Sequence, residues 1–435
     1  MSLQDTQGLS VSSDDPEIVG RLNEFDRSFL SYGKTAAAAW EAAERAPGQP
    51  LVAAKAAALA LFMQTGDAAA NATRFLDRAE GMLATALPRE RLWHQAVRAW
   101  AKSDLHGAIG LHERIVREFP RDLAAMKLGQ VHQFHIGDAE GMLRLAELAR
   151  PANEENPYLH GMRAFALEEC HHLDEAEASA RQAIAMLRRE PWAHHALAHV
   201  MEAQGRAAEG LETMLGFSDC WADCNSFMLT HNWWHAALFA IDCDDPEQAL
   251  ALYDQRVWGV WKEYSQDQVN AVALLARLEF VGLDAGGRWQ DLAQYLEPRL
   301  HEHVDPFLDL HYLLGLARAG YDASAQELLT SMAEYSHVAG DPVWHSVALP
   351  LGRGILAYGR QQWDEAFRQL RLGLEGIAGI GGSHAQRDLF HWLMLEAGWR
   401  AGRGPEIRPL LQLRVAARPG IARHRRELAR IDSAN

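Results

Sequence analysis

The sequence predicts an all-α protein, an α-solenoid built from repeated antiparallel helix pairs. Apolar residues recur at helical spacing along most of the 435 residues. No stretch shows a sustained alternation of β-branched and polar residues, so we expect almost no β-strand. Hydrophobic residues make up 48% of the chain, which is enough for a large buried core.

The first 33 residues are expected to form an N-terminal arm followed by one helix. The arm, about 15 residues long, is polar and is expected to be loose. Residues 15–17, Asp-Pro-Glu, are typical of a helix start, with a capping aspartate and proline at the first helical position. Gly33 ends this helix, and alanine-rich helices are expected at 34–44 and 51–65.

After residue 90, a small residue recurs twelve positions before an alanine. The pairs are Ala96 with Ala108, Ala164 with Ala176, Ala196 with Ala208, Ala237 with Ala249, and Gly354 with Ala366. Small side chains at this spacing suit two antiparallel helices that cross closely. Aspartate or asparagine before proline, at residues 156, 245, 305 and 341, marks further helix starts.

This pattern resembles the tetratricopeptide repeat, a helix pair of about 34 residues. The resemblance is clearest at residues 90–260 and 345–400, and we expect one tetratricopeptide-like solenoid over residues 34–435. Four short stretches restrict the resemblance to one family. They are Ala-His-His-Ala-Leu-Ala-His-Val at 193–200, His-Asn-Trp-Trp-His-Ala-Ala-Leu-Phe at 231–239, Asp-Leu-His at 309–311 and Gly-Gly-Ser-His-Ala-Gln-Arg-Asp at 381–388. In combination they resemble the tetratricopeptide repeat protein 38 family. That resemblance implies an all-helical repeat fold and no particular reaction.

Composition and charge limit the partners and the location. The net charge of −16 repels phosphate backbones, so we expect no nucleic-acid partner. The four cysteines suit a reducing cytoplasm, and the most apolar run, 53–63, is too short to span a membrane. We therefore expect a cytoplasmic protein that is not bound to membranes and that could form a homo-oligomer. The basic stretch from Arg414 to Arg430 is interpreted as a solvated final helix.

Two histidine pairs form the main candidate site. His195 and His199, like His231 and His235, are four residues apart, so each pair projects from one helical face. Glu202 continues the first face. Two imidazoles and a carboxylate are a common ligand set for a divalent transition metal, although the sequence lacks the glutamate of the zincin pattern. A metal-free polar pocket and purely structural histidines are the alternatives.

Other residues could complete this site. Asp309 and His311 are interpreted either as acid–base groups or as a first-turn acid and a packed histidine. Ser383 with Gln386 predicts a capping box, although a helix start with Arg387 could also hold an anion. Tryptophans such as Trp234 belong mainly to the core but could line a pocket.

The sequence leaves three functions open. The leading hypothesis is a helical-repeat binding protein with a histidine- and tryptophan-rich concave pocket for a small or peptidic ligand, including an anionic one. The ligand-binding candidates are His195, His199, His231, Trp234, His235, His311, Ser383, His384 and Arg387. The second hypothesis is a hydrolase that uses the histidines with Glu202 and Asp309, with catalytic candidates His199, His235, Asp309 and His311. The third is a plain protein-interaction scaffold.

Overall fold

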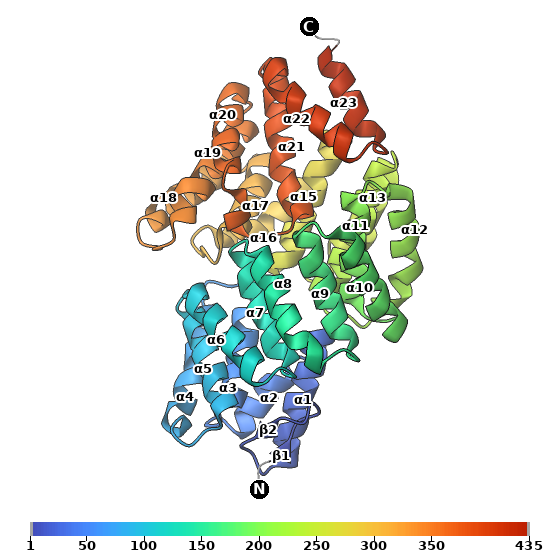
Figure 1. The fold of residues 1–435 in the computed structure, drawn as a ribbon. Helices are drawn as coiled ribbons and strands as arrows, with labels where there is room; N and C mark the ends of the chain where they lie inside the picture. The colour runs from blue at the N-terminus through green and yellow to red at the C-terminus, as the bar shows by residue number, and fades with distance from the viewer. Residues whose placement is uncertain (1–2, 433–435) are drawn as a thin grey trace. The chain divides into compact units, whose positions relative to one another are not determined.

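A computed structural model describes residues 3–432 of the chain, within which it has 23 α-helices and one two-stranded sheet (Figure 1). The predicted all-α fold class is confirmed. The contacts divide the chain into two compact units. Unit 1 runs to Leu197 and includes Cys220–Met228, whereas unit 2 comprises Ala198–Asp219 and the chain from Leu229 onward. The expectation of one continuous solenoid over residues 34–435 stays a prediction.

Unit 1 holds the first ten helices and the sheet. Its elements are β1 (Leu3–Gln4), β2 (Ser10–Val11), α1 (Pro16–Ser31), α2 (Ala38–Arg45), α3 (Pro50–Leu61), α4 (Ala68–Ala79), α5 (Pro88–Ala101), α6 (Leu105–Glu118), α7 (Leu123–His135), α8 (Ala139–Ala149), α9 (Pro157–Glu169) and α10 (Leu173–Met186). Successive helices such as α5, α6 and α7 pack against one another (Figure 1). The boundary between the units falls within α11 (Pro191–Ala203) and again within α13 (Ser226–Asp242).

Unit 2 continues the same arrangement of helix pairs. Its remaining helices are α12 (Ala207–Phe217), α14 (Pro246–Leu252), α15 (Ser265–Phe280), α16 (Arg288–Leu296), α17 (Pro306–Arg318), α18 (Asp322–Ser336), α19 (Leu349–Gly359), α20 (Trp363–Leu374), α21 (His384–Arg400), α22 (Gly404–Ala417) and α23 (Ala422–Asp432). No helix in the described part of the chain is long and apolar enough to cross a membrane.

Capping residues place the helix starts where the sequence predicts them. Asp15 accepts a hydrogen bond from the backbone N–H of Glu17 at the start of α1, and Asn156 accepts one from Tyr158 at the start of α9. Asp245 and Asp305 cap α14 and α17 in the same way. These side chains satisfy backbone donors that have no partner inside the helix.

Small residues stand at the helix crossings, as the repeat pattern predicts. In four of the five pairs both members are buried, and the second member is the fourth residue of its helix: Ala108, Ala176, Ala249 and Ala366. The pairing of Ala196 with Ala208 is wrong, because Ala208 is exposed. Gly210, the fourth residue of α12, is buried instead, against the ring of Phe239 on α13. The repeat register therefore shifts by two residues in this helix.

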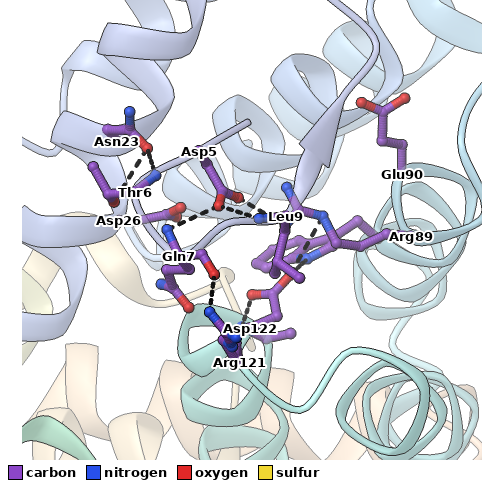
Figure 2. Close-up of polar contacts among 12 residues, drawn as sticks. Asp5, Thr6, Gln7, Leu9, Asn23, Asp26, Arg89, Glu90, Arg121 and Asp122 are labelled. Atoms are coloured by element: carbon purple, nitrogen blue, oxygen red, sulfur yellow. Dashed lines mark hydrogen bonds and ion pairs between the residues drawn. The ribbon is translucent and has the colours of Figure 1, made fainter. Parts of the chain in front are cut away.

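The N-terminal arm is not loose, which contradicts the expectation. Leu3 pairs with Val11 across β1 and β2. The carboxylate of Asp5 accepts hydrogen bonds from the backbone N–H groups of Gln7 and Leu9, and from Nη1 of Arg89 at 2.8 Å (Figure 2). The Asp5 and Arg89 side chains are buried in this ion pair. A polar segment is thus ordered by a buried arginine 84 residues away, which its local sequence does not show.

Substituting Gly210 by alanine tests the packing at this crossing. The added Cβ would lie 2.4 Å from ring carbons of Phe239, which is 1% exposed and has no room to move outward. We expect the free energy of unfolding, measured by urea denaturation, to fall by about 1–3 kcal/mol.

Gly216→Ala in the same helix is the matched control, because its Cβ would meet nothing within 4 Å. That change should raise the free energy of unfolding by about 0.5–1 kcal/mol, since alanine loses less backbone entropy than glycine. Equal effects of the two substitutions would contradict the close crossing.

Candidate functional site

Three of the predicted histidines meet in the interior of unit 2. His199 lies on α11, whereas His231 and His235 lie one turn apart on α13. The ring centroids of His199 and His235 are 4.5 Å apart, and those of His231 and His235 are 4.9 Å apart. One ring nitrogen from each of the three lies within 4.8 Å of the others. We call these three residues the histidine centre. Their exposed fractions are only 0–2%.

A hydrogen-bond chain fixes the ring of His231. Its Nδ1 lies 2.8 Å from Oδ1 of Asn270 on α15, and an amide oxygen can only accept. Nδ1 therefore carries the proton, and Nε2 keeps its lone pair. Asn270 in turn donates to Oγ1 of Thr230, which donates to Asp267. The Trp234 ring stacks on His231 with 5.2 Å between centroids.

Glu202 lies beside the centre as a partner of one ring. Its Oε2 is 3.7 Å from Nδ1 of His235, and its Oε1 is 3.9 Å from Nη1 of Arg418. Burial raises the pKa of the Glu202 carboxyl. A carboxylate on this side of the His235 ring leaves Nε2 as the nitrogen on the opposite edge. At 3.7 Å the Glu202 carboxylate lies beyond hydrogen-bond distance of the ring, so it acts on His235 through proximity and not through a hydrogen bond.

The environment keeps the three imidazoles uncharged. Burial lowers the pKa of His231 to about 4 and holds the pKa values of His199 and His235 well below their ordinary range. The positive charge of Arg277 lowers the pKa of His235 further, and that of Arg387 acts on His199. Neutral rings retain lone pairs at pH 7, so the centre can coordinate a cation or accept hydrogen bonds.

The helix start at Ser383 is occupied by its own cap. The Ser383 Oγ accepts from the backbone N–H of Gln386, and the Gln386 side chain accepts from the backbone N–H of Ser383. The Arg387 guanidinium donates to the carbonyl of Gly382 and lies 3.3 Å from Nδ1 of His384. The predicted capping box is confirmed. His384 and Arg387 lie close enough to His199 to influence its pKa.

The two residues of the Asp309–His311 phrase point to different partners. The Nδ1 of His311 donates to the carbonyl of Phe307 at 2.7 Å, and its ring packs against Phe307 and Phe390. Asp309 instead accepts from Nδ1 of His303 at 2.6 Å. Asp309 and His311 therefore do not pair with each other, as expected for helical residues two apart.

His195 belongs to unit 1, which runs to Leu197. Its ring stacks on Trp192 at a centroid distance of 4.2 Å and packs against Phe165. Its predicted role as a ligand-binding or metal-ligating residue stays a prediction.

The basic C-terminal stretch is only partly solvated, which corrects the sequence interpretation. Arg414 on α22 forms an ion pair with Asp388, and Arg423 on α23 lies 3.4 Å from Asp242. The guanidinium of Arg423 also lies over the Trp392 ring. The charge of Arg414 holds the pKa of the half-buried Asp388 below its usual range, although burial opposes this. These arginines balance buried acids rather than forming a free basic face.

Sequence reasoning missed several residues around the centre. Asn270 orients His231, and Arg277 lies over the Trp234 ring and donates to the carbonyl of Ala385. Both lie on α15, within a run where buried polar residues interrupt alanines and leucines. This pattern is the one feature of the sequence that could have pointed to Asn270 and Arg277, because a buried polar residue on an apolar helix needs a hydrogen-bond partner.

Comparisons with known proteins bear on the fold alone. No protein-family model matches the sequence. A human IFIT1 dimer with m7Gppp-AAAA is similar with a TM-score of 0.43 and 13% identity, over 98% of this chain and 96% of that one. The APC/C hetero-tetramer Cut9–Hcn1 is similar with a TM-score of 0.40 and 13% identity, over 87% of this chain and 74% of that one. A tetratricopeptide repeat protein from Parabacteroides merdae is similar with a TM-score of 0.28 and 13% identity, over 70% of this chain and 98% of that one. TM-scores this low carry no argument about function.

Replacing His311 by asparagine tests the cost of burying an uncharged histidine. Asparagine keeps a donor near the position of Nδ1 but cannot titrate. Burial lowers the pKa of His311 to about 4, from an ordinary 6.5. Between these values the unfolded chain binds a proton that the folded protein does not, so stability falls as the pH falls.

On going from pH 7 to pH 4, His311→Asn should therefore lose about 3 kcal/mol less unfolding free energy than the unsubstituted protein. Urea denaturation at the two pH values measures this. The exposed His337→Asn is the control and should leave the pH dependence unchanged. The same sensitivity in His311→Asn as in the unsubstituted protein would contradict the assigned environment.

Proposed function

We propose that this chain is a helical-repeat binding protein whose unit 2 binds a divalent transition metal ion at the histidine centre. Its tetratricopeptide-like helix pairs are a fold used by interaction scaffolds. The observation that carries the metal proposal is the approach of three ring nitrogens, from His199, His231 and His235, to within 4.8 Å of one another. Three neutral imidazoles are a common protein ligand set for zinc.

The groups outside the three rings support this assignment. Metal-bound histidines usually donate their second nitrogen to an oxygen, which fixes the ring and raises its basicity. His231 has such a partner in Asn270, and His235 faces Glu202. Glu202 lies 3.7 Å from Nδ1 of His235, so it adds an acidic group next to the ring without a hydrogen bond. The positive charges of Arg277 and Arg387 oppose a bare cation, so the ion would bind together with an anionic ligand that balances its charge.

Other readings have less support from the geometry. A peptide needs an open groove, whereas the centre is closed to solvent. A small anionic metabolite fits the two arginines, but Arg387 is already engaged with Gly382 and His384. A hydrolase that used Asp309 at this centre would have to release Asp309 from His303. Relation to the tetratricopeptide repeat protein 38 family, the absence of nucleic-acid binding and homo-oligomerisation remain proposals.

Zinc titration tests the proposal. The full chain, purified without an affinity tag and stripped with a chelator, is titrated with Zn²⁺ in competition with a chromophoric chelator. We expect one equivalent to bind. His235→Asn should weaken binding at least about 100-fold, and Asn270→Ala about 10–100-fold, because it removes only an orienting partner.

His337→Asn removes an exposed imidazole of the same unit and should leave the affinity unchanged. Circular dichroism confirms that each variant is folded. Zinc binding of equal strength in His235→Asn, or none in the unsubstituted protein, would refute the metal centre. A thermal shift caused by a metal-free organic acid and lost in His235→Asn would support the small-ligand reading instead.

A further inference from the structure

A row of three hydrogen-bonded side chains stands apart from the histidine centre in unit 2. The Nδ1 of His303 lies 2.6 Å from Oδ2 of Asp309, and its Nε2 lies 2.7 Å from Oγ of Ser331. Asp309 is in the first turn of α17, His303 precedes that helix, and Ser331 is on α18. A hydroxyl, an imidazole and a carboxylate in this order form the arrangement that activates a serine nucleophile.

The protons on Asp309, His303 and Ser331 determine which of these groups donates and which accepts each hydrogen bond. The carboxylate of Asp309 accepts, so His303 carries a proton on Nδ1 and presents the lone pair of Nε2. The Ser331 hydroxyl can then donate to Nε2. Burial raises the pKa of Asp309 to about 6, while its hydrogen bond with His303 opposes the increase. Asp309 is therefore mainly ionised at neutral pH, in the form that holds this tautomer.

A second imidazole approaches the same hydroxyl from another side. The Nδ1 of His301 lies 2.8 Å from Oγ of Ser331, and its Nε2 lies 3.0 Å from Oε1 of Glu327. The Glu327 carboxylate can only accept, so the proton of a neutral His301 ring lies on Nε2. The Nδ1 of His301 then offers a lone pair to the Ser331 hydroxyl, as a second acceptor besides Nε2 of His303.

Burial decreases along the row, as a reactive site requires. Asp309 is 0% exposed and His303 is 8% exposed, whereas Ser331 is half-buried and His301 is exposed. A substrate can therefore reach the hydroxyl while the orienting carboxylate stays dry. The rings of Tyr335 and Trp344 pack on His303, with centroid distances of 5.0 and 5.9 Å.

The backbone near this row is irregular in two places. His303 has φ of +47°, a left-handed conformation that is uncommon for a residue with a side chain. Trp344 begins a π-helical turn, Trp344–Ala348. Both features cost stability and occur often at functional sites.

We propose that Ser331 is the nucleophile of a hydrolase activity on carboxylic esters with an apolar acyl group. The Ser331 oxygen attacks the ester carbonyl carbon while its proton passes to Nε2 of His303. The ester C–O bond then breaks, and the departing alcohol takes that proton. Water, deprotonated by His303, attacks the acyl-serine and releases the carboxylic acid, which restores the hydroxyl. No oxidant or further reactant is needed.

The surroundings suggest the substrate class. Tyr335, which is half-buried and follows Ser331 by four residues on α18, provides aromatic surface beside the imidazole. An apolar acyl chain of a few carbons would remove this surface from water.

Covalent labelling tests the nucleophile directly. The full chain is treated with an alkyl fluorophosphonate, digested, and mapped by mass spectrometry. We expect an adduct on Ser331 and none on Ser324, a half-buried serine of the same helix that donates to Glu297. This comparison needs no substitution, so failure of a variant to fold cannot obscure it. Absence of a Ser331 adduct in the folded protein would overturn the proposal.

Variants then test the base and the positioning residue, with p-nitrophenyl butyrate as the substrate. Ser331→Ala should abolish turnover and Ser324→Ala should not change it. His303→Asn retains a residue type that tolerates positive φ but removes the base, so kcat should fall at least about 100-fold. Asp309→Asn acts through His303 and should lower kcat by about 100-fold or more with KM unchanged.

Labelling of Ser331 that is insensitive to His303→Asn would show a merely exposed hydroxyl and would refute base activation. The result is independent of the zinc titration, because none of these residues belongs to the histidine centre. Hydrolysis that persists in Ser331→Ala but needs His235 would transfer the activity to that centre and overturn this assignment.

Discussion

Close approach between paired helices is the constraint on which both units depend. In several pairs a residue with one side-chain carbon or none stands at the fourth position of the second helix, as at Ala176 and Ala366. A larger side chain would force the helices apart and leave voids in the core. Gly210 meets the same requirement against Phe239 after a two-residue shift in register. The geometric need is preserved although the sequence spacing is not.

This packing explains why the conspicuous histidines lie inside. In unit 2, α13 is buried along most of its length, and His231 and His235 face other side chains rather than solvent. A buried imidazole avoids the cost of an isolated charge by remaining neutral. The nearby ionised groups are tolerated because they are paired, as Arg414 is with Asp388 and Arg423 with Asp242.

Unit 2 thus contains two polar groupings with different chemistry. The histidine centre is closed and uncharged, and its rings can offer lone pairs to an ion. The row from Asp309 through His303 to Ser331 runs from a dry carboxylate to a half-exposed hydroxyl, which suits proton transfer at the surface. A neutral histidine can donate from one ring nitrogen and offer a lone pair from the other, which suits both the histidine centre and the row. The hydrogen-bond partner of each ring decides which nitrogen offers the lone pair.

The sequence by itself determined the local features of this protein. Helical spacing, the caps at Asn156 and Asp305, the capping box at Ser383 and the shared face of His231 and His235 all follow from contacts within a few residues. Such contacts depend only on backbone geometry and neighbouring side chains. The tertiary structure alone decided that Asp5 binds Arg89, that Asn270 orients His231 and that His303 joins Asp309 to Ser331. Those partners are brought together by the packing of whole helices, and packing depends on the shape of every side chain in the interface, which no local spacing encodes.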